Sequence, residues 1–357
     1  MKGKMLLIPL VLLLIASLVA VGCAAPAPAP APGPVPAAGP EKITWMYGYY
    51  GPSTHPQVVP PGEEWAANVA ARVWPEYDFE LKWAFGGVIA QASEIIDATG
   101  AGMQDCGRWM PSKGPGKTDL SDLASFPVLP VDYEAASNAQ MEFYRTPLIV
   151  EEYAKWNCKV LAPSVFSPQN LILTFPAESL ADLDGKKIRI WGPYCKMYEK
   201  VGVVPILFSI SEVYEALSRG IVEGAMTGYP ENFVTYHFHD IAKHIILVGT
   251  GPTGSPIIVN SDSWNALPAK VQEAMNAETN LMGKYSKKHV TAAEAPAFEA
   301  LAEAGVVIRE VPAADKVKFM ALVYEVVDEV VAELDKKGLP GSEAWEDFAA
   351  ICEKWGG

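Results

Sequence analysis

The amino-acid sequence predicts an α/β protein with two lobes and a ligand cleft between them, on three grounds. The chain has 357 residues, which is enough for two domains. Half of these residues are apolar and a fifth are charged, so the chain can bury a large core. Strand-like and helix-like segments alternate, which is typical of mostly parallel sheets covered by helices on both faces. Because the alternation runs through two successive regions, two lobes are expected.

The first region carries strand and helix patterns in turn. One of its helices places Trp65, Val69 and Val73 on a single face. A longer helical stretch is expected to break near Pro147, because proline lacks the N–H that a helix interior needs. In order, the segments are a strand at 42–47, a helix at 62–74, a strand at 79–83, a helix at 90–99, a helical stretch at 132–156, and strands at 159–162 and 171–175.

The second region continues the alternation and ends in long helices. A helical segment opens at Pro268, reaches about Gly305, and is expected to kink at Pro296. The last helix has apolar side chains along one stripe, which suits packing against a core better than a coiled coil. In order, the segments are a strand at 187–190, a helix at 194–201, a strand at 204–207, a helix at 213–219, strands at 222–226, 245–248 and 256–259, and the last helix at 313–337.

The amino terminus predicts export from the cytoplasm. Lys2 and Lys4 precede an apolar run over 5–21, and small residues follow, as in a signal peptide at 1–22. Cys23 then resembles the lipobox cysteine of bacterial lipoproteins, although Ala20 stands where leucine is usual. A lipidated Cys23 and an Ala/Pro-rich linker are therefore expected at 23–41, ahead of a plain secreted protein or a membrane-anchored one. At about 3.1 Å per residue the extended linker would span roughly 50 Å.

The charge balance excludes several classes of partner. Twenty-eight Lys and Arg stand against 42 Asp and Glu, a net charge of −14, which becomes −16 once Lys2 and Lys4 are removed. Nucleic acids and anionic membrane surfaces need a basic face, and no Lys/Arg cluster is present. The sequence also lacks the P-loop, G-x-S-x-G and H-E-x-x-H motifs, and no G-x-G-x-x-G follows a strand. Neither an enzyme nor a cofactor is expected.

Two groups of residues leave alternatives open. His237, His239, Asp240 and His244 could offer metal ligands, but no single regular conformation gathers all four on one face. We favour a solvated surface patch, so no metal is expected. An exported metal-dependent hydrolase that uses this histidine cluster remains an alternative. The later cysteines could form one or two disulfides or stay as buried thiols; they are Cys106, Cys158, Cys195 and Cys352.

The segment 180–226 resembles the signature region of the solute-binding proteins of TRAP transporters, the DctP-type family. The family pattern is Asp-x-x-Gly, Lys-x-Arg on a strand, a helix, Gly-x-x-Pro, and then E-x-Y-x-A-L-x-x-G-x-[VI]-[DE]-G. The matching residues here are Asp182, Gly185, Lys187, Arg189, Gly202, Pro205, Glu212, Tyr214, Ala216, Leu217, Gly220, Val222, Glu223 and Gly224. Outside this segment the agreement is looser, but it extends over the rest of the folded chain.

Arg189 is the strongest candidate for a ligand contact. It lies at the carboxyl end of its strand, because Gly192-Pro193 ends that strand, and open α/β sheets bind ligands at this edge. A guanidinium presents a planar pair of donors to a carboxylate. Spacing alone leaves a surface ion pair equally plausible. The resemblance decides for the site, because it implies that this arginine holds the carboxylate of the substrate.

The other candidates come from the resemblance or from strand ends. The family places a polar or aromatic ligand contact where Thr227 and Tyr229 stand, and some members carry a second arginine near Gln169. Aromatic residues near predicted strand ends could line a pocket or pack in the core. Those included as candidates are Tyr47, Trp109 and Trp191. Together they indicate an organic acid with an apolar or aromatic body.

The resemblance implies a periplasmic-binding-protein-like fold whose first lobe comprises 42–166 and about 255–292, and whose second comprises 167–254 and about 293–357. The expected function is the extracytoplasmic solute-binding subunit of a TRAP transporter. It would capture an organic carboxylate for uptake driven by an ion gradient through separate membrane permease subunits. A solute-binding lipoprotein of an ATP-driven importer is a further alternative. The protein is expected in the periplasm or otherwise outside the cytoplasm, anchored to a bacterial membrane through its lipidated cysteine.

Overall fold

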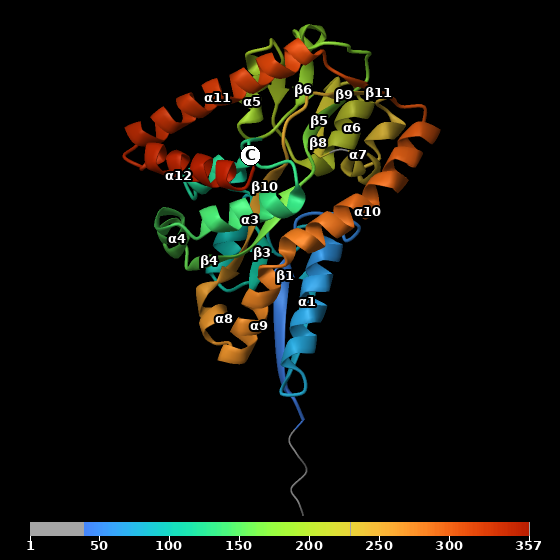
Figure 1. The fold of residues 1–357 in the computed structure, drawn as a ribbon. Helices are drawn as coiled ribbons and strands as arrows, with labels where there is room; N and C mark the ends of the chain where they lie inside the picture. Colours follow the sequence, from blue (N-terminus) through green and yellow to red (C-terminus); the bar gives the residue numbers. More distant parts are fainter. Residues whose placement is uncertain (1–38, 229, 357) are drawn as a thin grey trace, which may run out of the picture. The chain divides into compact units, whose positions relative to one another are not determined.

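Two β-sheets organise the chain, which we describe for residues 39–228 and 230–356 of a computed structural model (Figure 1). Contacts divide the chain into residues 1–39 and 40–357, and the description concerns the second unit. The first sheet has the strand order β2-β1-β3-β10-β4. Its strands are β1 (Glu41–Gly48), β2 (Tyr77–Ala84), β3 (Cys106–Arg108), β4 (Cys158–Phe166) and β10 (Thr253–Asn260).

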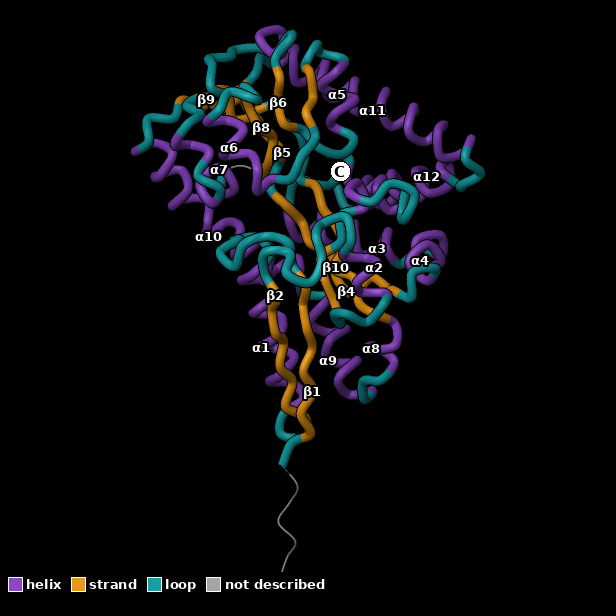
Figure 2. The backbone as a smooth tube through the Cα atoms, turned by 180° about the vertical axis from the view of Figure 1, so that it is seen from behind, coloured by secondary structure: helices purple, strands orange, loops and turns teal. Residues whose placement is uncertain are grey.

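The second sheet has the order β11-β9-β5-β8-β6-β7. Its strands are β5 (Gln169–Leu173), β6 (Lys187–Arg189), β7 (Val204–Ile206), β8 (Gly224–Gly228), β9 (His244–Leu247) and β11 (Val307–Glu310). The chain passes from the first sheet to the second between β4 and β5, through Ser167 and Pro168 alone. It returns between β9 and β10, and both passages run between the sheets in Figure 2.

Because the chain passes directly from one sheet to the other, each sheet contains antiparallel pairs beside the parallel pairs that the sequence analysis expected. β10 runs antiparallel to both β3 and β4, and β5 runs antiparallel to both β8 and β9. The remaining pairs are parallel, for example β1 with β2 and β6 with β8. Parallel neighbours need a long crossover connection. β5 and β10 instead follow short passages from the other sheet, and each runs antiparallel to both of its neighbours. Both sheets are therefore mixed.

Helices cover the sheets and also connect them. Against the first sheet, α1 and α9 bury Trp65, Val69 and Val271 in one apolar cluster with Trp45 and Phe79. The helices that belong mainly to this part are α1 (Val59–Val73), α2 (Ile95–Gly100), α3 (Tyr133–Tyr144), α4 (Pro147–Ala154), α8 (Ser261–Asn265) and α9 (Ala269–Thr279). Those beside the second sheet are α5 (Tyr194–Glu199), α6 (Val213–Ser218) and α7 (Glu231–Thr235).

The late helices reach across both sheets. α10 (Met282–Glu303) packs on α3 and α1 at one end and contacts α7 further along. α11 (Ala313–Lys336) packs on α5, and α12 (Gly341–Lys354) returns to pack on α3 (Figure 1). Short 3₁₀ turns complete the description: η1 (Pro111–Lys113), η2 (Ser121–Ser125), η3 (Leu180–Leu183), η4 (Ile210–Glu212) and η5 (Phe238–Asp240).

Two sequence expectations for the helices need correction. The long segment after Pro268 is two helices, α9 and α10, rather than one, and Pro296 lies inside α10. α12 was not expected at all. No helix within the described ranges is long and apolar enough to cross a membrane. The expected signal peptide at 1–22, Cys23 and the part of the expected linker up to residue 38 lie outside the described residues.

Candidate functional site

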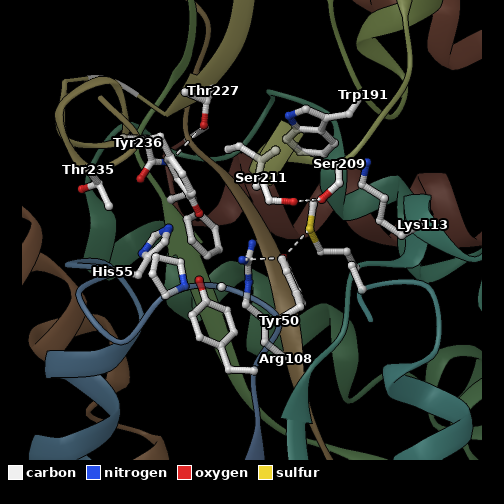
Figure 3. A pocket seen from close by; sticks show the side chains of 18 of the residues that line it. Tyr50, His55, Arg108, Lys113, Trp191, Ser209, Ser211, Thr227, Thr235 and Tyr236 are labelled. Atoms are coloured by element: carbon white, nitrogen blue, oxygen red, sulfur yellow. Dashed lines mark hydrogen bonds between the residues drawn. The ribbon is translucent and has the colours of Figure 1, made fainter. Parts of the chain in front are cut away.

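A cavity of about 960 Å³ opens between the two sheets (Figure 3). Its wall combines residues of the first sheet, such as Arg108 and Phe166, with residues of the second, such as Arg189 and Thr227. Aromatic side chains form much of the lining: Tyr49, Tyr50, His55, Phe166, Trp191, Tyr214 and Tyr236. A cavity of this size, mostly apolar with a few polar groups, is typical of small-molecule sites.

Arg189 is buried in the cavity wall with only 3% of its surface exposed. It ends β6, where Ile188 faces the core and the arginine takes the other face of the strand. Its Nε donates to the carbonyl of Phe208 at 3.2 Å, and its Nη1 donates to the carbonyl of Met226 at 3.1 Å. Burial lowers the pKa of Arg189 to about 10, so the group keeps its charge at neutral pH. Neutral carbonyls therefore orient a guanidinium that forms no ion pair with any described carboxylate.

Arg108 is a second cation in the same wall, and the sequence analysis missed it. It ends β3 and is 6% exposed. Its Nε donates to Ser255 Oγ at 2.9 Å, and its Nη1 donates to the Tyr50 hydroxyl at 2.7 Å. Its guanidinium lies over the Phe166 ring, 3.7 Å from the ring centre. The sequence analysis expected no strand at Cys106–Arg108, so nothing in it marked Arg108 as a residue at a strand end.

The electrostatics of the cavity are dominated by positive charge. Lys113 in η1 lines it, and burial together with the charge of Arg189 lowers the lysine pKa to about 8. Burial, reinforced by Arg108, lowers the pKa of His55 to about 3, so this imidazole is neutral near pH 7. The only acidic side chain among the described lining residues is Asp240. Such a site favours an anion.

The structure brings four of the sequence candidates to the cavity: Arg189, Gln169, Thr227 and Trp191. Tyr47 and Trp109 are instead core residues, which corrects their inclusion as pocket candidates. The Tyr47 ring packs against Trp83 with ring centres 4.3 Å apart. The Trp109 indole is fully buried, and its N–H donates to Thr118 Oγ1 at 2.7 Å. Tyr229 lies outside the described residues.

The histidine cluster does not assemble a metal site. His237 and Asp240 reach the rim of the cavity, whereas the Nδ1 atom of His239 lies 3.1 Å from the backbone oxygen of Phe233. His244 belongs to β9. Within 39–228 and 230–356, no three His, Cys, Asp or Glu side chains are grouped to hold a metal ion. The four cysteines of this part, Cys106, Cys158, Cys195 and Cys352, are free thiols.

Comparison with known proteins identifies the family. The profile described as "Bacterial extracellular solute-binding protein, family 7" (DctP) matches residues 49–334. The chain belongs to this family. The resemblance read from the segment 180–226 is thereby confirmed, and the family consists of solute-binding proteins rather than enzymes.

Individual DctP-family relatives are distant. The chain is 27% identical over 178 residues to the C4-dicarboxylate-binding periplasmic protein DctP of Rhodobacter capsulatus, covering 49% of this chain and 52% of that protein. The chain thus spans about half the length of this relative. A solute-binding protein of Chromohalobacter salexigens is 24% identical over 297 residues, 79% of this chain and 84% of that protein.

Solved structures of TRAP solute-binding proteins share the fold. One is a marine metagenome TRAP solute-binding protein specific for aromatic acid ligands, in complex with metahydroxyphenylacetate. Its TM-score is 0.77 at 18% identity, covering 88% of this chain and 100% of that chain. A TRAP solute-binding protein of Rhodoferax ferrireducens with copurified benzoate also gives 0.77 at 18% identity, covering 88% and 98%. The two-lobed α/β fold expected from the sequence is confirmed.

Proposed function

We propose that this protein is the solute-binding subunit of a TRAP transporter and captures an organic carboxylate in the cavity between its sheets. The observation that carries the proposal is Arg189: a charged guanidinium, buried in the cavity wall and oriented by two carbonyls, without a carboxylate partner among the described residues. A buried charge without a partner is costly, and an anionic ligand supplies the missing counter-charge.

The lining supports an acid with an aromatic or apolar body. Trp191 and Tyr214 come from the part of the chain that holds Arg189, and Tyr50 and Phe166 come from the opposite side. Flat aromatic walls on both sides would enclose a ring once the lobes close. Relatives of the same fold were solved with benzoate and with metahydroxyphenylacetate. The C4-dicarboxylate specificity named for the Rhodobacter protein is the competing substrate class.

We propose further that the two lobes close on the ligand by a hinge. The single-step passage at Ser167 and Pro168 and the return between β9 and β10 are the places where backbone rotation would move one sheet relative to the other. Captured solute would then be delivered to separate permease subunits that use an ion gradient, with the solute released unchanged. The family is extracellular, so this delivery takes place outside the cytoplasm.

We also propose that the protein is attached to the bacterial membrane through a lipid on Cys23. The order of basic start, apolar run, cysteine and proline-rich linker supports it. In a bacterial host, the full-length protein should partition with membranes and gain the mass of a lipid at Cys23. Cys23→Ser should appear in the soluble fraction without that mass. If the wild type and Cys23→Ser divide equally between membrane and soluble fractions, the lipid attachment is contradicted and a plain secreted protein is favoured.

The test of solute capture is thermal unfolding of the folded part, starting after Cys23, with a panel of aromatic and aliphatic acids. An acid at a hundred times its dissociation constant should stabilise the protein by about 2.7 kcal/mol. Arg189→Ala should lose this stabilisation, and Arg189→Lys should keep a small part of it because a point charge replaces a planar pair of donors.

Arg219→Lys is the matched control. Arg219 is 71% exposed and pairs with Glu215 on the surface, so its replacement should leave the response to acids intact. A panel in which no acid stabilises the wild type would contradict the proposal. Equal stabilisation of wild type and Arg189→Ala would remove Arg189 from the site.

A further inference from the structure

Met110 lies in the wall of the cavity and ends a chain of hydrogen bonds there. Nη1 of Arg108 donates to the hydroxyl oxygen of Tyr50 at 2.7 Å, and that hydroxyl donates to Met110 Sδ at 2.7 Å. Both hydrogen bonds are drawn as dashed lines in Figure 3. One phenol therefore connects a cation of the ligand cavity to a thioether.

The local backbone explains why a methionine reaches this place. The chain stays extended beyond β3, since the N–H of Trp109 donates to the carbonyl of Pro256 in β10. Successive residues of an extended chain point to opposite faces. Arg108 and Met110 therefore face the cavity, whereas the Trp109 indole between them is buried in the core. Met110 is half-buried and lines an open cavity, so a small oxidant can approach it.

The chemistry of the groups fixes the direction of these hydrogen bonds. A guanidinium has only donors, so Tyr50 accepts from Arg108 and places its own proton elsewhere. Burial raises the pKa of Tyr50, so the phenol keeps this proton at neutral pH. The acceptor of the proton is Met110 Sδ. Because a thioether is a weak acceptor, a ligand oxygen that enters the cavity can take over this hydrogen bond at little cost.

Oxidation of the thioether would change this acceptor. The sulfur lone pair attacks one oxygen of hydrogen peroxide, the O–O bond breaks, and the leaving hydroxide takes up the proton of the transferred oxygen. The products are methionine sulfoxide and water, so sulfur loses two electrons and the peroxide gains them. The new oxygen is a strong acceptor on the very atom that faces the Tyr50 hydroxyl. It would hold the phenol proton and occupy space beside Arg108.

We propose that Met110 is a reversible oxidation site, and that its oxidation weakens ligand binding by capturing the Tyr50 hydroxyl. The proposal rests on capture of an organic acid as the function of the cavity. The family is extracellular, and proteins outside the cytoplasm lack the thiol systems that keep cytosolic side chains reduced. Methionine sulfoxide is reduced back by specific reductases, so the affinity would return.

The other methionines supply the comparison. Met110 is the only methionine among the described residues that line the cavity. Met226 supplies a backbone carbonyl to Arg189, but its side chain is fully buried and closed to oxidants. Met103 is 63% exposed and does not line the cavity, so it should oxidise readily without any effect on binding. It is the internal control.

The first test treats the wild type with hydrogen peroxide and follows each methionine by peptide mass spectrometry. Titration calorimetry then uses the acid that stabilises the protein most in thermal unfolding, with benzoate tried first. Protein oxidised at Met110 should bind about 2- to 10-fold more weakly, as expected for the loss of one hydrogen bond to the ligand. Treatment with both methionine sulfoxide reductases, one for each epimer, should restore the affinity.

Variants assign the effect to one sulfur atom. Met110→Leu keeps a similar volume without a sulfur, so peroxide should leave its affinity as it was before treatment. Met110→Gln places an amide oxygen near the position of the sulfoxide oxygen, and it should bind weakly before any oxidant is added. Met103→Leu is the matched control and should respond to peroxide as the wild type does. Circular dichroism checks that each variant folds.

Tyr50→Phe tests the route through the phenol. Without the hydroxyl, the sulfoxide has no phenol proton to capture, so oxidation should reduce the affinity of Tyr50→Phe less than that of the wild type. An equal loss in both proteins would show that the sulfoxide acts by its bulk, and would overturn the role given to Tyr50.

A protection experiment needs no variant. Bound acid should slow the oxidation of Met110 while the rate at Met103 stays the same, because the ligand fills the cavity that only Met110 lines. Unchanged affinity after complete oxidation of Met110, or a Met110 that stays reduced while Met103 is fully oxidised, would overturn this proposal and leave solute capture standing. If no acid binds the untreated wild type, the proposed function is wrong and this inference falls with it.

Discussion

Arg108 and Phe166 form a stacked pair in which the guanidinium carbon lies 3.7 Å from the centre of the phenyl ring. Phe166 is the last residue of β4, and the chain leaves the first sheet at the very next residue. The ring therefore fixes the guanidinium of Arg108 against one of the passages between the sheets. A movement of this passage would move the cation with it.

Phe166→Leu should weaken binding of an acid by roughly 2- to 30-fold, because a desolvated cation–π contact contributes about 0.5–2 kcal/mol. Titration calorimetry of wild type, Phe166→Leu, Arg108→Met and the double variant gives the coupling between the two residues. We expect the double variant to lose less affinity than the sum of the two single losses, because part of the effect of Phe166 runs through Arg108. Strictly additive losses would show that Phe166 contacts the ligand independently of Arg108.

The contrast between Arg189 and Arg108 shows what the sequence could reveal about the site. Arg189 was identified because a family pattern and the Gly192-Pro193 stop placed it at a strand end. Arg108 ends a strand of the same length, three residues, but the sequence Cys-Gly-Arg of Cys106–Arg108 contains no β-branched residue and belongs to no family pattern that we identified. Its neighbour Trp109 was noticed for its aromatic ring, yet the strand turns that ring into the core. Tertiary packing decides whether a residue at the end of a short strand faces the core or the cavity, and the sequence of that segment alone does not specify the packing.

The same limit applies to the fold. α11 was predicted within a residue of its bounds, because an apolar stripe marks it, whereas α9 and α10 were taken for one segment. β3 and β11 were not expected, although Val307 and Ile308 of β11 are β-branched residues of the kind that strands favour. The antiparallel entry of β10 depends on a passage between sheets, and local patterns do not specify it.

Gly100 offers a test of the packing beneath the site. A Cβ at this position would lie 2.2 Å from the backbone oxygen of Trp156. Because this oxygen belongs to the backbone, it cannot move aside as the end of a flexible side chain could. Gly100→Ala should therefore lower the free energy of unfolding by more than about 2 kcal/mol, as overpacking does. Gly102→Ala is the control. Gly102 has a φ of 71°, but a Cβ added there would meet no other atom within 4 Å, so only the backbone conformation is strained. It should cost only about 1 kcal/mol in denaturant melts. Equal losses would contradict the clash.

His55 should remain neutral through the mildly acidic range. Burial, helped by the charge of Arg108, lowers its folded pKa to about 3, below the value near 6.5 of an unfolded histidine. The unfolded chain thus binds more protons between these values, so this contribution to stability is complete above pH 6.5 and is lost as pH falls towards 3. Histidine NMR, assigned with His55→Gln, should show one ring that does not titrate between pH 5 and 8. A midpoint near 6.5 for that signal would refute the prediction.

Glu231 accepts hydrogen bonds from Gln57 and from Ser167, which lies in the passage between the sheets, and it should show the reverse pH dependence. It is 2% exposed, and its Oε2 accepts hydrogen bonds from Gln57 Nε2 and Ser167 Oγ, each at 3.2 Å. Its Oε1 is buried without a hydrogen-bond partner among the described residues. Burial raises its pKa to about 7, and the neighbouring Glu294 acts in the same direction. Tyr133 also faces Glu231.

The folded state therefore holds this proton between about pH 4.5 and 7, where the unfolded chain has released it. Stability should fall as pH rises through this window and level off above it. Glu231→Gln keeps an acceptor for both hydrogen bonds and removes the charge. It should flatten the pH profile and raise the free energy of unfolding at pH 8 by about 2–3 kcal/mol.

Glu152→Gln is the matched control for Glu231→Gln. Burial also raises the pKa of Glu152 to about 7, but both of its oxygens accept backbone N–H groups, from Leu120 at 2.8 Å and Ser121 at 3.0 Å. An amide there turns one N–H₂ group against a backbone donor, so this variant should be less stable than wild type at pH 8. Urea melts at pH 5, 6.5 and 8 distinguish the two. If both variants are stabilised alike at pH 8, the unpartnered oxygen of Glu231 is not the cause.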